Sequence, residues 1–205
     1  MAEERTHRHI GDHDWHSRQY VDDWIARDFS RDTERRPVLE RMLAAAPFAA
    51  DDEIRVLDVG AGYGLVTEVT LARFPRAQVT LLDYSEPMFA HARERLADRC
   101  AQIGFIRRDL SESGWTRGLE GAFDLAVSSI AIHNLRDYAL IADCYRGIRA
   151  TLKPGGAFLD CDLVSFSGGL DSHLRWLREA GFAQVECLWQ SDPFAILAAF
   201  TAARA

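Results

Sequence analysis

Glycines and acidic residues follow the apolar segments in the first half of the chain, in a pattern suited to a nucleoside ligand. The stretch RVLDVGAGYG contains Asp58 and then Gly60, Gly62 and Gly64. Glycines at such a turn let the backbone approach a ligand closely and adopt torsions that a Cβ forbids. Asp83 follows the next apolar segment, about 20 residues after Gly60, which is the spacing typical of a carboxylate that binds ribose hydroxyls. These residues predict a site for a nucleoside-containing cofactor.

The same turn distinguishes between two classes of cofactor. A dinucleotide-binding turn has the pattern G-x-G-x-x-G, but the last position of that pattern falls on Leu65 in this chain. Asp58 would also bring a negative charge close to a pyrophosphate at a helix N-terminus, a place that favours anions. A cofactor with a cationic centre and no phosphate fits these residues better, so a nicotinamide oxidoreductase is the weaker alternative.

Further polar residues follow the later apolar segments. Asp109, in RRDL, can accept a hydrogen bond from an adenine amino group, or it can cap the next turn, as aspartate often does. Tyr84 can pack on the face of an adenine. His133 follows SSIAI and is the candidate base for an acceptor that must lose a proton; the alternative is a structural histidine at the start of a helix.

Segments with strand and helix periodicity alternate through most of the chain. Strands are expected at IRVLDVG, AQVTLLDYS, IGFIRRDL, FDLAVSSIAI, AFLDCDLV, AQVECLWQ and FAILAAF. Helices are expected between them, and KPGG should end the helix that precedes the fifth strand. This alternation predicts a doubly wound α/β fold with a mostly parallel sheet and helices on both faces. In such sheets ligands bind beyond the carboxyl ends of the strands, where the polar residues above are placed.

Two helices are expected before the first strand. One lies in WHSRQYVDDWIARDF, whose aromatic residues Tyr20 and Trp24 are expected to pack against the core rather than to cover a ligand. The other lies in PVLERMLAAA, with Pro37 in its first turn. We therefore expect residues 1–50 to form an N-terminal helical extension and residues 51–205 to form one cofactor-binding domain.

Composition restricts the class of protein further. The chain has 205 residues, 48% of them hydrophobic, and a formal net charge of -7, which provides no electrostatic footprint for a long nucleic acid. The four cysteines form no C-x-x-C pair, and His7, His9, His13 and His16 favour a polar tail over a metal site. No apolar run is long enough to span a bilayer. We expect a cytoplasmic protein without a bound metal.

Several segments, in this order and spacing, resemble the class I S-adenosylmethionine-dependent methyltransferases: VLDVGAGYG, LLDYSEPMFAHARERL, RRDL, FDLAVSSIAIHNL and LKPGGAF. The resemblance extends from Arg55 to Phe158 and implies a Rossmann-like, seven-stranded sheet whose last strand is antiparallel. It also implies that S-adenosyl-L-methionine is the cofactor and that its methyl group is transferred to an acceptor.

The resemblance also implies a role for each residue that matches a motif. Lining the methionine moiety would be Gly60, Ala61, Gly62 and Gly64, with Asp58 near the ammonium group. The ribose and adenine would be bound by Asp83, Tyr84, Met88, Asp109 and Leu110. Ser128 would lie near the end of the cofactor that carries the reacting methyl group. The carboxylates in this set suit a methyl donor that carries a net positive charge.

The acceptor is less well indicated than the cofactor. SSIAIH lacks the Asn/Asp-Pro-Pro-aromatic sequence typical of methylation of amino groups on bases or glutamine, and no cysteine adjoins it for covalent attack on a pyrimidine. We expect a small-molecule acceptor, His133 as the catalytic residue, and a possible homodimer. Only VSFSGGLDS joins the fifth strand to the next helix, so the acceptor side is expected either to be open or to be covered by the N-terminal helices acting as a lid. The alternative is a non-catalytic S-adenosylmethionine-binding protein or partner subunit with the same fold.

Overall fold

The computed structural model describes residues 13–203 and forms a seven-stranded sheet with the order β3-β2-β1-β4-β5-β7-β6. The strands are β1 (Arg55–Val59), β2 (Gln78–Asp83), β3 (Ile103–Arg107), β4 (Phe123–Ser129), β5 (Leu152–Asp162), β6 (Gln184–Ser191) and β7 (Phe194–Phe200). β1 to β5 pair in parallel, and β7 is antiparallel to both of its neighbours. The predicted Rossmann-like fold with an antiparallel last strand is therefore confirmed.

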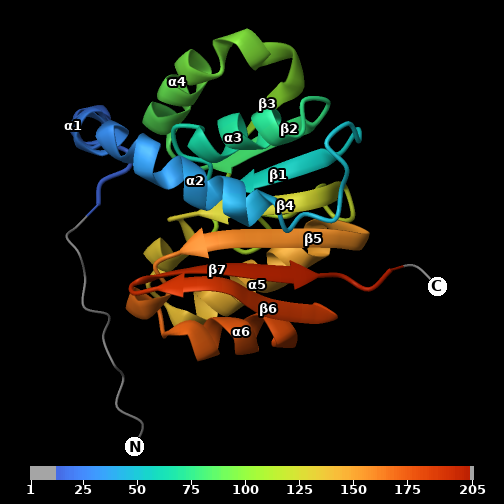
Figure 1. Cartoon of the computed structure of the whole chain (residues 1–205). Helices are drawn as coiled ribbons and strands as arrows, with labels where there is room; N and C mark the ends of the chain where they lie inside the picture. The colour runs from blue at the N-terminus through green and yellow to red at the C-terminus, as the bar shows by residue number, and fades with distance from the viewer. Residues whose placement is uncertain (1–12, 204–205) are drawn as a thin grey trace, which may run out of the picture.

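Helices cover both faces of this sheet (Figure 1). One apolar layer packs under α2 (Asp32–Leu43), α3 (Leu65–Arg73) and α4 (Glu86–Arg95), and the other packs under α5 (Tyr138–Thr151) and α6 (Leu170–Glu179). The connections include the short 3-10 helices η1 (Phe29–Arg31), η2 (Ala97–Gln102), η3 (Ile132–Leu135) and η4 (Val164–Phe166). In β1, Val56 and Leu57 are both fully buried, one in each layer. This explains why successive residues of this central parallel strand are buried, instead of alternate residues.

The strand order places the ligand crevice. The chain leaves β1 toward β2 on one side and later returns to place β4 on the other side of β1. The loops that follow β1 and β4 therefore diverge, which opens a crevice at the carboxyl ends of these strands. The glycine turn follows β1, and His133 follows β4 within η3.

Pro37 does not lie where the sequence pattern placed it. α2 begins at Asp32, so Pro37 lies inside the helix instead of in its first turn. Proline inside a helix removes one backbone hydrogen bond and crowds the preceding turn. The helix nevertheless continues through Leu39, Met42 and Leu43, which are at most 2% exposed, so tertiary packing outweighs the local preference.

The KPGG segment also differs from the expectation. It lies within β5, which begins at Leu152, directly after α5 ends at Thr151. The pairing of β4 with β5 shifts register between Phe123 and Leu125, and this irregularity accommodates the glycine-containing start of the strand. The regular parallel register resumes at Ala157, where the sequence pattern had placed the strand.

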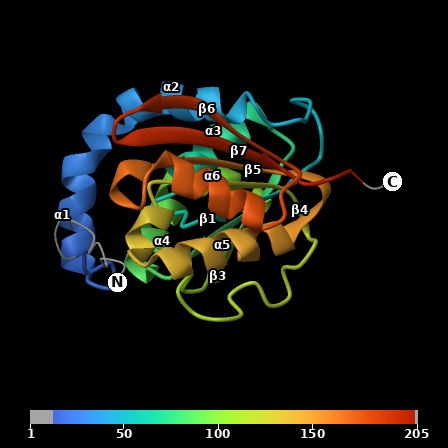
Figure 2. The ribbon, with the colours of Figure 1, turned by 90° about the horizontal axis from the view of Figure 1, so that it is seen from below.

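α1 (Arg18–Asp28) lies at the end of the sheet toward which the parallel strands point, and α2 runs from there across one face of the sheet, as both views show (Figures 1 and 2). α1 begins after Ser17, whose side chain accepts a hydrogen bond from the backbone N–H of Tyr20. Asp22 of α1 bonds to Nε2 of His91 on α4 at 2.7 Å. Within the described residues, none of the helices combines the length and apolarity needed to cross a membrane.

Candidate functional site

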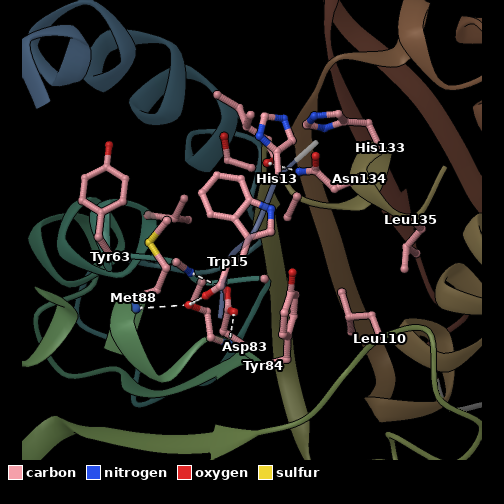
Figure 3. Close-up of a pocket in the computed structure, with 18 of the residues that line it drawn as sticks. His13, Trp15, Tyr63, Asp83, Tyr84, Met88, Leu110, His133, Asn134 and Leu135 are labelled. Carbon is pink, nitrogen blue, oxygen red and sulfur yellow. Dashed lines mark hydrogen bonds between the residues drawn. The ribbon is translucent and has the colours of Figure 1, made fainter. Parts of the chain in front are cut away.

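A cavity of about 670 Å³ opens at the carboxyl ends of the central strands. Figure 3 shows Asp83 and Tyr84 on one side of it and His133 and Asn134 on another, with Trp15 between them. Polar and apolar groups are both present in the lining, which is typical of sites for small organic molecules. The cavity coincides with the crevice expected from the strand order.

Gly60, Ala61 and Gly62 of the glycine turn line this cavity. Gly60 has φ +69° and Gly62 has φ +51°, both in the left-handed region that favours glycine. Backbone N–H groups of Gly60 and Ala61 donate to the carbonyl oxygen of Leu82 at 2.8 and 3.1 Å. These bonds join the turn after β1 to the end of β2, so the turn and Asp83 are held in a fixed relation.

Replacing Gly60 with alanine is expected to destabilise the protein by roughly 1–3 kcal/mol, because the residue would keep a strained torsion. A Cβ at this position would also lie 2.4 Å from the Cβ of Ala131, so the loop after β4 must move. The matched control is Gly104→Ala, where an added Cβ meets nothing within 4 Å. Thermal unfolding of both variants checks this; equal melting temperatures would contradict the structural role given to Gly60.

Asp83 is positioned by backbone donors at the end of β2. Its Oδ2 accepts from the N–H of Gly62 at 2.9 Å, and its Oδ1 accepts from the N–H of Ser85 at 2.8 Å. Burial raises the pKa of Asp83, and the hydrogen bonds from Ser85, Gly62 and Tyr84 oppose that effect. Each carboxylate oxygen can accept more than one hydrogen bond, so Asp83 can still bind a pair of ligand hydroxyls at the cavity.

Asp58 lies beneath the glycine turn and is fully buried. Its Oδ2 accepts from the hydroxyl of Thr67 at 2.6 Å, whereas its Oδ1 has no hydrogen-bond partner in the structure. Burial raises the pKa of Asp58 to about 7. A buried carboxylate with an unsatisfied oxygen is stabilised in its charged form by a cationic ligand nearby, so the residues present fit a cofactor with an ammonium group above this turn.

The pKa of Asp58 predicts a pH-dependent stability in the ligand-free protein. The folded protein retains this proton up to about pH 7, whereas the unfolded chain loses it near the ordinary aspartate pKa of 3.8. The free energy of unfolding therefore falls as pH rises through this window, by an amount on the order of a few kcal/mol. Urea unfolding between pH 4.5 and 8 should show a weaker fall in Asp58→Asn, while the exposed Asp98→Asn should behave as wild type. Identical slopes in all three proteins would contradict this assignment.

Residues after β2 and β3 form the side of the cavity nearest Asp83. Tyr84, Met88, Asp109 and Leu110 all line it. Oδ1 of Asp109 accepts from the backbone N–H and the hydroxyl of Ser111, at 2.8 and 2.6 Å. Asp109 therefore caps a turn and also lines the cavity, and its hydrogen bond to an adenine amino group stays a prediction.

His133 is oriented by Asp162, a partner that the sequence patterns did not assign. Its Nδ1 lies 2.5 Å from Oδ1 of Asp162, and its backbone N–H donates to Oδ2 at 2.9 Å. Burial alone would raise the pKa of Asp162, but the charge and hydrogen bonds of His133, with a further bond from Leu163, lower it below its ordinary value. The bond at Nδ1 leaves Nε2 of His133 for the cavity. Ile130, directly after β4, has φ +53°, a strained torsion of a kind that clusters at functional sites.

Nine of the twelve residues predicted for the site line this cavity. The other three, Asp58, Gly64 and Ser128, do not line it. Ser128 is fully buried and its hydroxyl donates to the carbonyl oxygen of Val59 at 2.9 Å, so its side chain does not reach the cavity. Because successive strand residues point to opposite faces, its neighbour Ser129 lines the cavity instead. Gly64 is the N-cap residue directly before α3 and faces Ala92 of α4.

The N-terminal segment supplies cavity residues that the sequence patterns placed elsewhere. His13, Trp15, His16 and Trp24 line the cavity, so His13 and His16 do not belong to a tail remote from the site; His7 and His9 lie outside the described residues. The backbone carbonyl of Trp15 accepts from the hydroxyl of Ser85 at 2.5 Å. In Figure 3 the Trp15 ring lies over the centre of the cavity. Trp24 both lines the cavity and packs against Tyr63, 5.8 Å between ring centroids.

Comparisons with known proteins agree with this geometry. Residues 56–156 match the model of a methyltransferase domain family. The chain is 32% identical to malonyl-[acyl-carrier protein] O-methyltransferase of Xylella fastidiosa over 83% of this chain and 56% of the relative. It is 31% identical to trans-aconitate 2-methyltransferase of Rhodopseudomonas palustris over 79% of this chain and 57% of that protein. An O-methyltransferase family protein from Burkholderia thailandensis has a similar fold, with a TM-score of 0.73, 18% identity, and coverage of 91% of this chain and 60% of that chain.

The fold and the site together define a Rossmann-like domain with a cavity at the carboxyl ends of its central strands. The chain belongs to the class I S-adenosylmethionine-dependent methyltransferase family. It spans about half the length of three of the curated relatives that it matches, between 46% and 57%.

Proposed function

We propose that this protein transfers the methyl group of S-adenosyl-L-methionine to a small-molecule acceptor. The observation that carries the proposal is the arrangement of Asp83 and the glycine turn at a cavity whose far side carries His133. A carboxylate for the ribose and a glycine turn for the methionine moiety occur where the strand order opens the crevice.

Each half of the cofactor has residues suited to it. Asp83 binds the ribose hydroxyls, and Tyr84, Met88, Asp109 and Leu110 surround the adenine. Gly60, Ala61 and Gly62 pack against the methionine moiety, and Asp58 stabilises its ammonium group from beneath the turn. When bound, the cofactor supplies a methyl group already activated on a sulfonium, so the protein is not required to generate the electrophile.

The chain's own contribution to the reaction is to position the acceptor and exclude water. In-line displacement requires the acceptor atom opposite the departing sulfur, and orientation of this kind can lower a barrier by roughly 7–11 kcal/mol. His133, held by Asp162, contacts the acceptor and takes a proton from it when the acceptor is a hydroxyl or an amine. Trp15 and Trp24 cover the cavity, so residues 13–50 of the N-terminal extension act as a lid on the domain that begins at residue 51.

The relatives supply the first acceptors to test. They are named for malonyl-[acyl-carrier protein] and for trans-aconitate, so compounds of these chemical types belong in the screen together with simple alcohols, amines and acids. Association into a homodimer, a cytoplasmic location and the absence of a nucleic-acid partner stay predictions.

A methyl-transfer screen tests the proposal. Protein, S-adenosyl-L-methionine and each acceptor are incubated, and S-adenosylhomocysteine is quantified against a reaction without acceptor. We expect release that depends on one class of small molecule and is lost in Asp83→Ala. Tight binding of the cofactor with no turnover on any class would favour the non-catalytic alternative.

A further inference from the structure

Asp160, a second aspartate near the end of β5, has no role in the proposed function. It precedes Asp162 by two residues, so the two side chains point to the same face of the sheet, and both are fully buried. Asp162 is bonded to Nδ1 and to the backbone N–H of His133, and to the backbone N–H of Leu163. Among the described residues, by contrast, neither carboxyl oxygen of Asp160 has a hydrogen-bond partner. Two aspartates on one face therefore have very different surroundings.

The face of β5 that carries Asp160 packs against α5 and α6. Tyr145 of α5 contacts Phe158, which lies two residues before Asp160 on the same face, with 5.9 Å between ring centroids. The hydroxyl oxygen of Tyr145 lies 2.6 Å from Nδ1 of His173, on α6. Tyr145 and His173 are both fully buried. Asp160 therefore belongs to a buried polar cluster between the sheet and these two helices.

The partners of His173 determine where its hydrogen lies. Nε2 is bonded to the carbonyl oxygen of Ser167 at 3.0 Å, and a carbonyl can only accept, so Nε2 carries the hydrogen. The hydroxyl of Ser167 lies 2.9 Å from the same nitrogen and donates to the carbonyl oxygen of Leu163 at 3.3 Å. Burial lowers the pKa of His173, which favours the neutral imidazole. Nδ1 then has only a lone pair, so its bond to Tyr145 uses the hydroxyl proton of the tyrosine.

The hydroxyl groups of Tyr145 and Ser128 share this face with Asp160, and both use their protons elsewhere. The proton of Tyr145 is used at His173. Ser128, which pairs with Asp160 across β4 and β5, donates to the carbonyl oxygen of Val59 at 2.9 Å. A buried carboxylate without a donor is strongly disfavoured, whereas a protonated carboxyl group can itself donate to the oxygen of Tyr145. The hydrogen bonds therefore favour a neutral Asp160.

The electrostatics of the cluster agree with this assignment. Burial, and after it the charge of Asp162, raises the pKa of Asp160 well above its ordinary value, while the hydroxyl of Tyr145 opposes this effect in part. The charge and hydrogen bonds of His133 outweigh burial at Asp162 and lower its pKa. Burial raises the pKa of Cys144, the neighbouring thiol on α5, so this group is neutral as well. Two carboxyl groups with pKa values shifted in opposite directions take different protonation states.

We propose that Asp160 holds a proton in the folded protein and is thereby a positioning residue for His133. With Asp160 neutral, Asp162 carries the single negative charge of the pair and is not repelled from its hydrogen bonds to His133. The proton of Asp160 also completes a hydrogen-bonded chain through Tyr145 and His173 to the backbone that follows β5. A second charge would favour the protonated form of His133 and make it a poorer base at neutral pH. This catalytic consequence rests on the proposed function, whereas the protonation states do not.

Infrared difference spectroscopy of the full-length protein tests the proton of Asp160 directly. Spectra of the wild type and of Asp160→Asn are subtracted at pH 7. We expect the wild type to show the C=O band of a protonated carboxyl group that Asp160→Asn lacks, and the subtraction cancels the contribution of Asp58, whose pKa is about 7. The matched control is Asp171→Asn, at an exposed aspartate of α6, which should lose carboxylate bands alone. Loss of carboxylate bands alone in Asp160→Asn would overturn the proposal.

Imidazole NMR of ¹⁵N-labelled protein tests the effect on His133. The pH midpoint of the His133 signals should be unchanged in Asp160→Asn and should fall by about one unit or more in Asp162→Asn, because only the second change removes a charge. His173 should be neutral, with its hydrogen on Nε2, in the wild type and in Asp160→Asn. An equal fall of the midpoint in both variants, or a doubly protonated His173 in the wild type, would contradict the proposal.

These measurements separate the inference from the proposed function. Thermal unfolding shows whether Asp160→Asn is folded, and if it is not, the signals of His173 in the wild type decide by themselves. Where the wild type turns over an acceptor, kcat of Asp160→Asn should keep the wild-type dependence on pH, and a loss as large as that of Asp162→Asn would count against the inference. Absence of turnover in the wild type would count against the proposed function, and the infrared and NMR results would still decide on Asp160.

Discussion

Replacing His133 with alanine is expected to lower kcat on the order of 10²–10⁴-fold with an acceptor that must lose a proton, since this is the usual contribution of a positioned base. Cofactor affinity should change little, because His133 lies across the cavity from Asp83 (Figure 3). Asp162→Asn should cause a smaller loss in kcat, because the side chain keeps its shape but no longer fixes the imidazole with a charge. Steady-state kinetics over a range of pH measures both effects.

The matched control for this experiment is His91→Ala. His91 is also bonded to an aspartate, Asp22, but lies on α4 and does not line the cavity. The kcat of the His91→Ala protein should equal that of the wild type. Near-full turnover of His133→Ala at every pH would exclude His133 as the base, and an equal fall in both histidine variants would point to a loss of stability instead.

Replacing Asp83 with alanine is expected to weaken binding of S-adenosyl-L-methionine by a factor on the order of 100 or more, because hydrogen bonds to a charged group contribute about 1.5–3 kcal/mol each. The change also removes the acceptor of the Gly62 and Ser85 N–H groups, so the glycine turn loses its fixed position. Asp83→Asn keeps one acceptor oxygen and should lie between alanine and wild type. Isothermal calorimetry gives the affinities.

Asp98→Ala is the control for the Asp83 variants, since Asp98 is an exposed aspartate remote from the cavity lining. Its affinity for the cofactor should be unchanged. Wild-type affinity in Asp83→Ala, with the fold intact by circular dichroism, would remove Asp83 from the cofactor site.

The parts of the site that depend on strand ends were predictable from the sequence. Gly60 directly follows β1, Asp83 is the last residue of β2, and Asp109 lies two residues after β3. Parallel strands bring their carboxyl ends to one edge of the sheet. Local patterns were therefore sufficient to predict most of the residues that line the cavity near Asp83. They failed at Ser128, because a one-residue uncertainty along a strand exchanges the two faces of the sheet.

The contacts around His133 could not be predicted from the sequence, because they join residues that are distant in the chain. Asp162 reaches His133 from the neighbouring strand, across a separation of 29 residues. Trp15 and Arg35 reach the cavity only after α1 and α2 dock on the sheet, and no local spacing indicates that docking. One signal was available: Asp162 ends an apolar strand, and a carboxylate at such a strand end is a candidate partner for a histidine in the crevice.

Calorimetry of the wild-type protein with S-adenosyl-L-methionine, S-adenosylhomocysteine and NAD tests the central claim most directly. The claim is that the turn after β1, with Asp58 beneath it and Leu65 in place of a third dinucleotide-type glycine, binds a sulfonium nucleoside and not a pyrophosphate. We predict saturable binding of both S-adenosyl compounds at one site per chain and no binding of NAD. Binding of NAD without binding of either S-adenosyl compound would contradict the account.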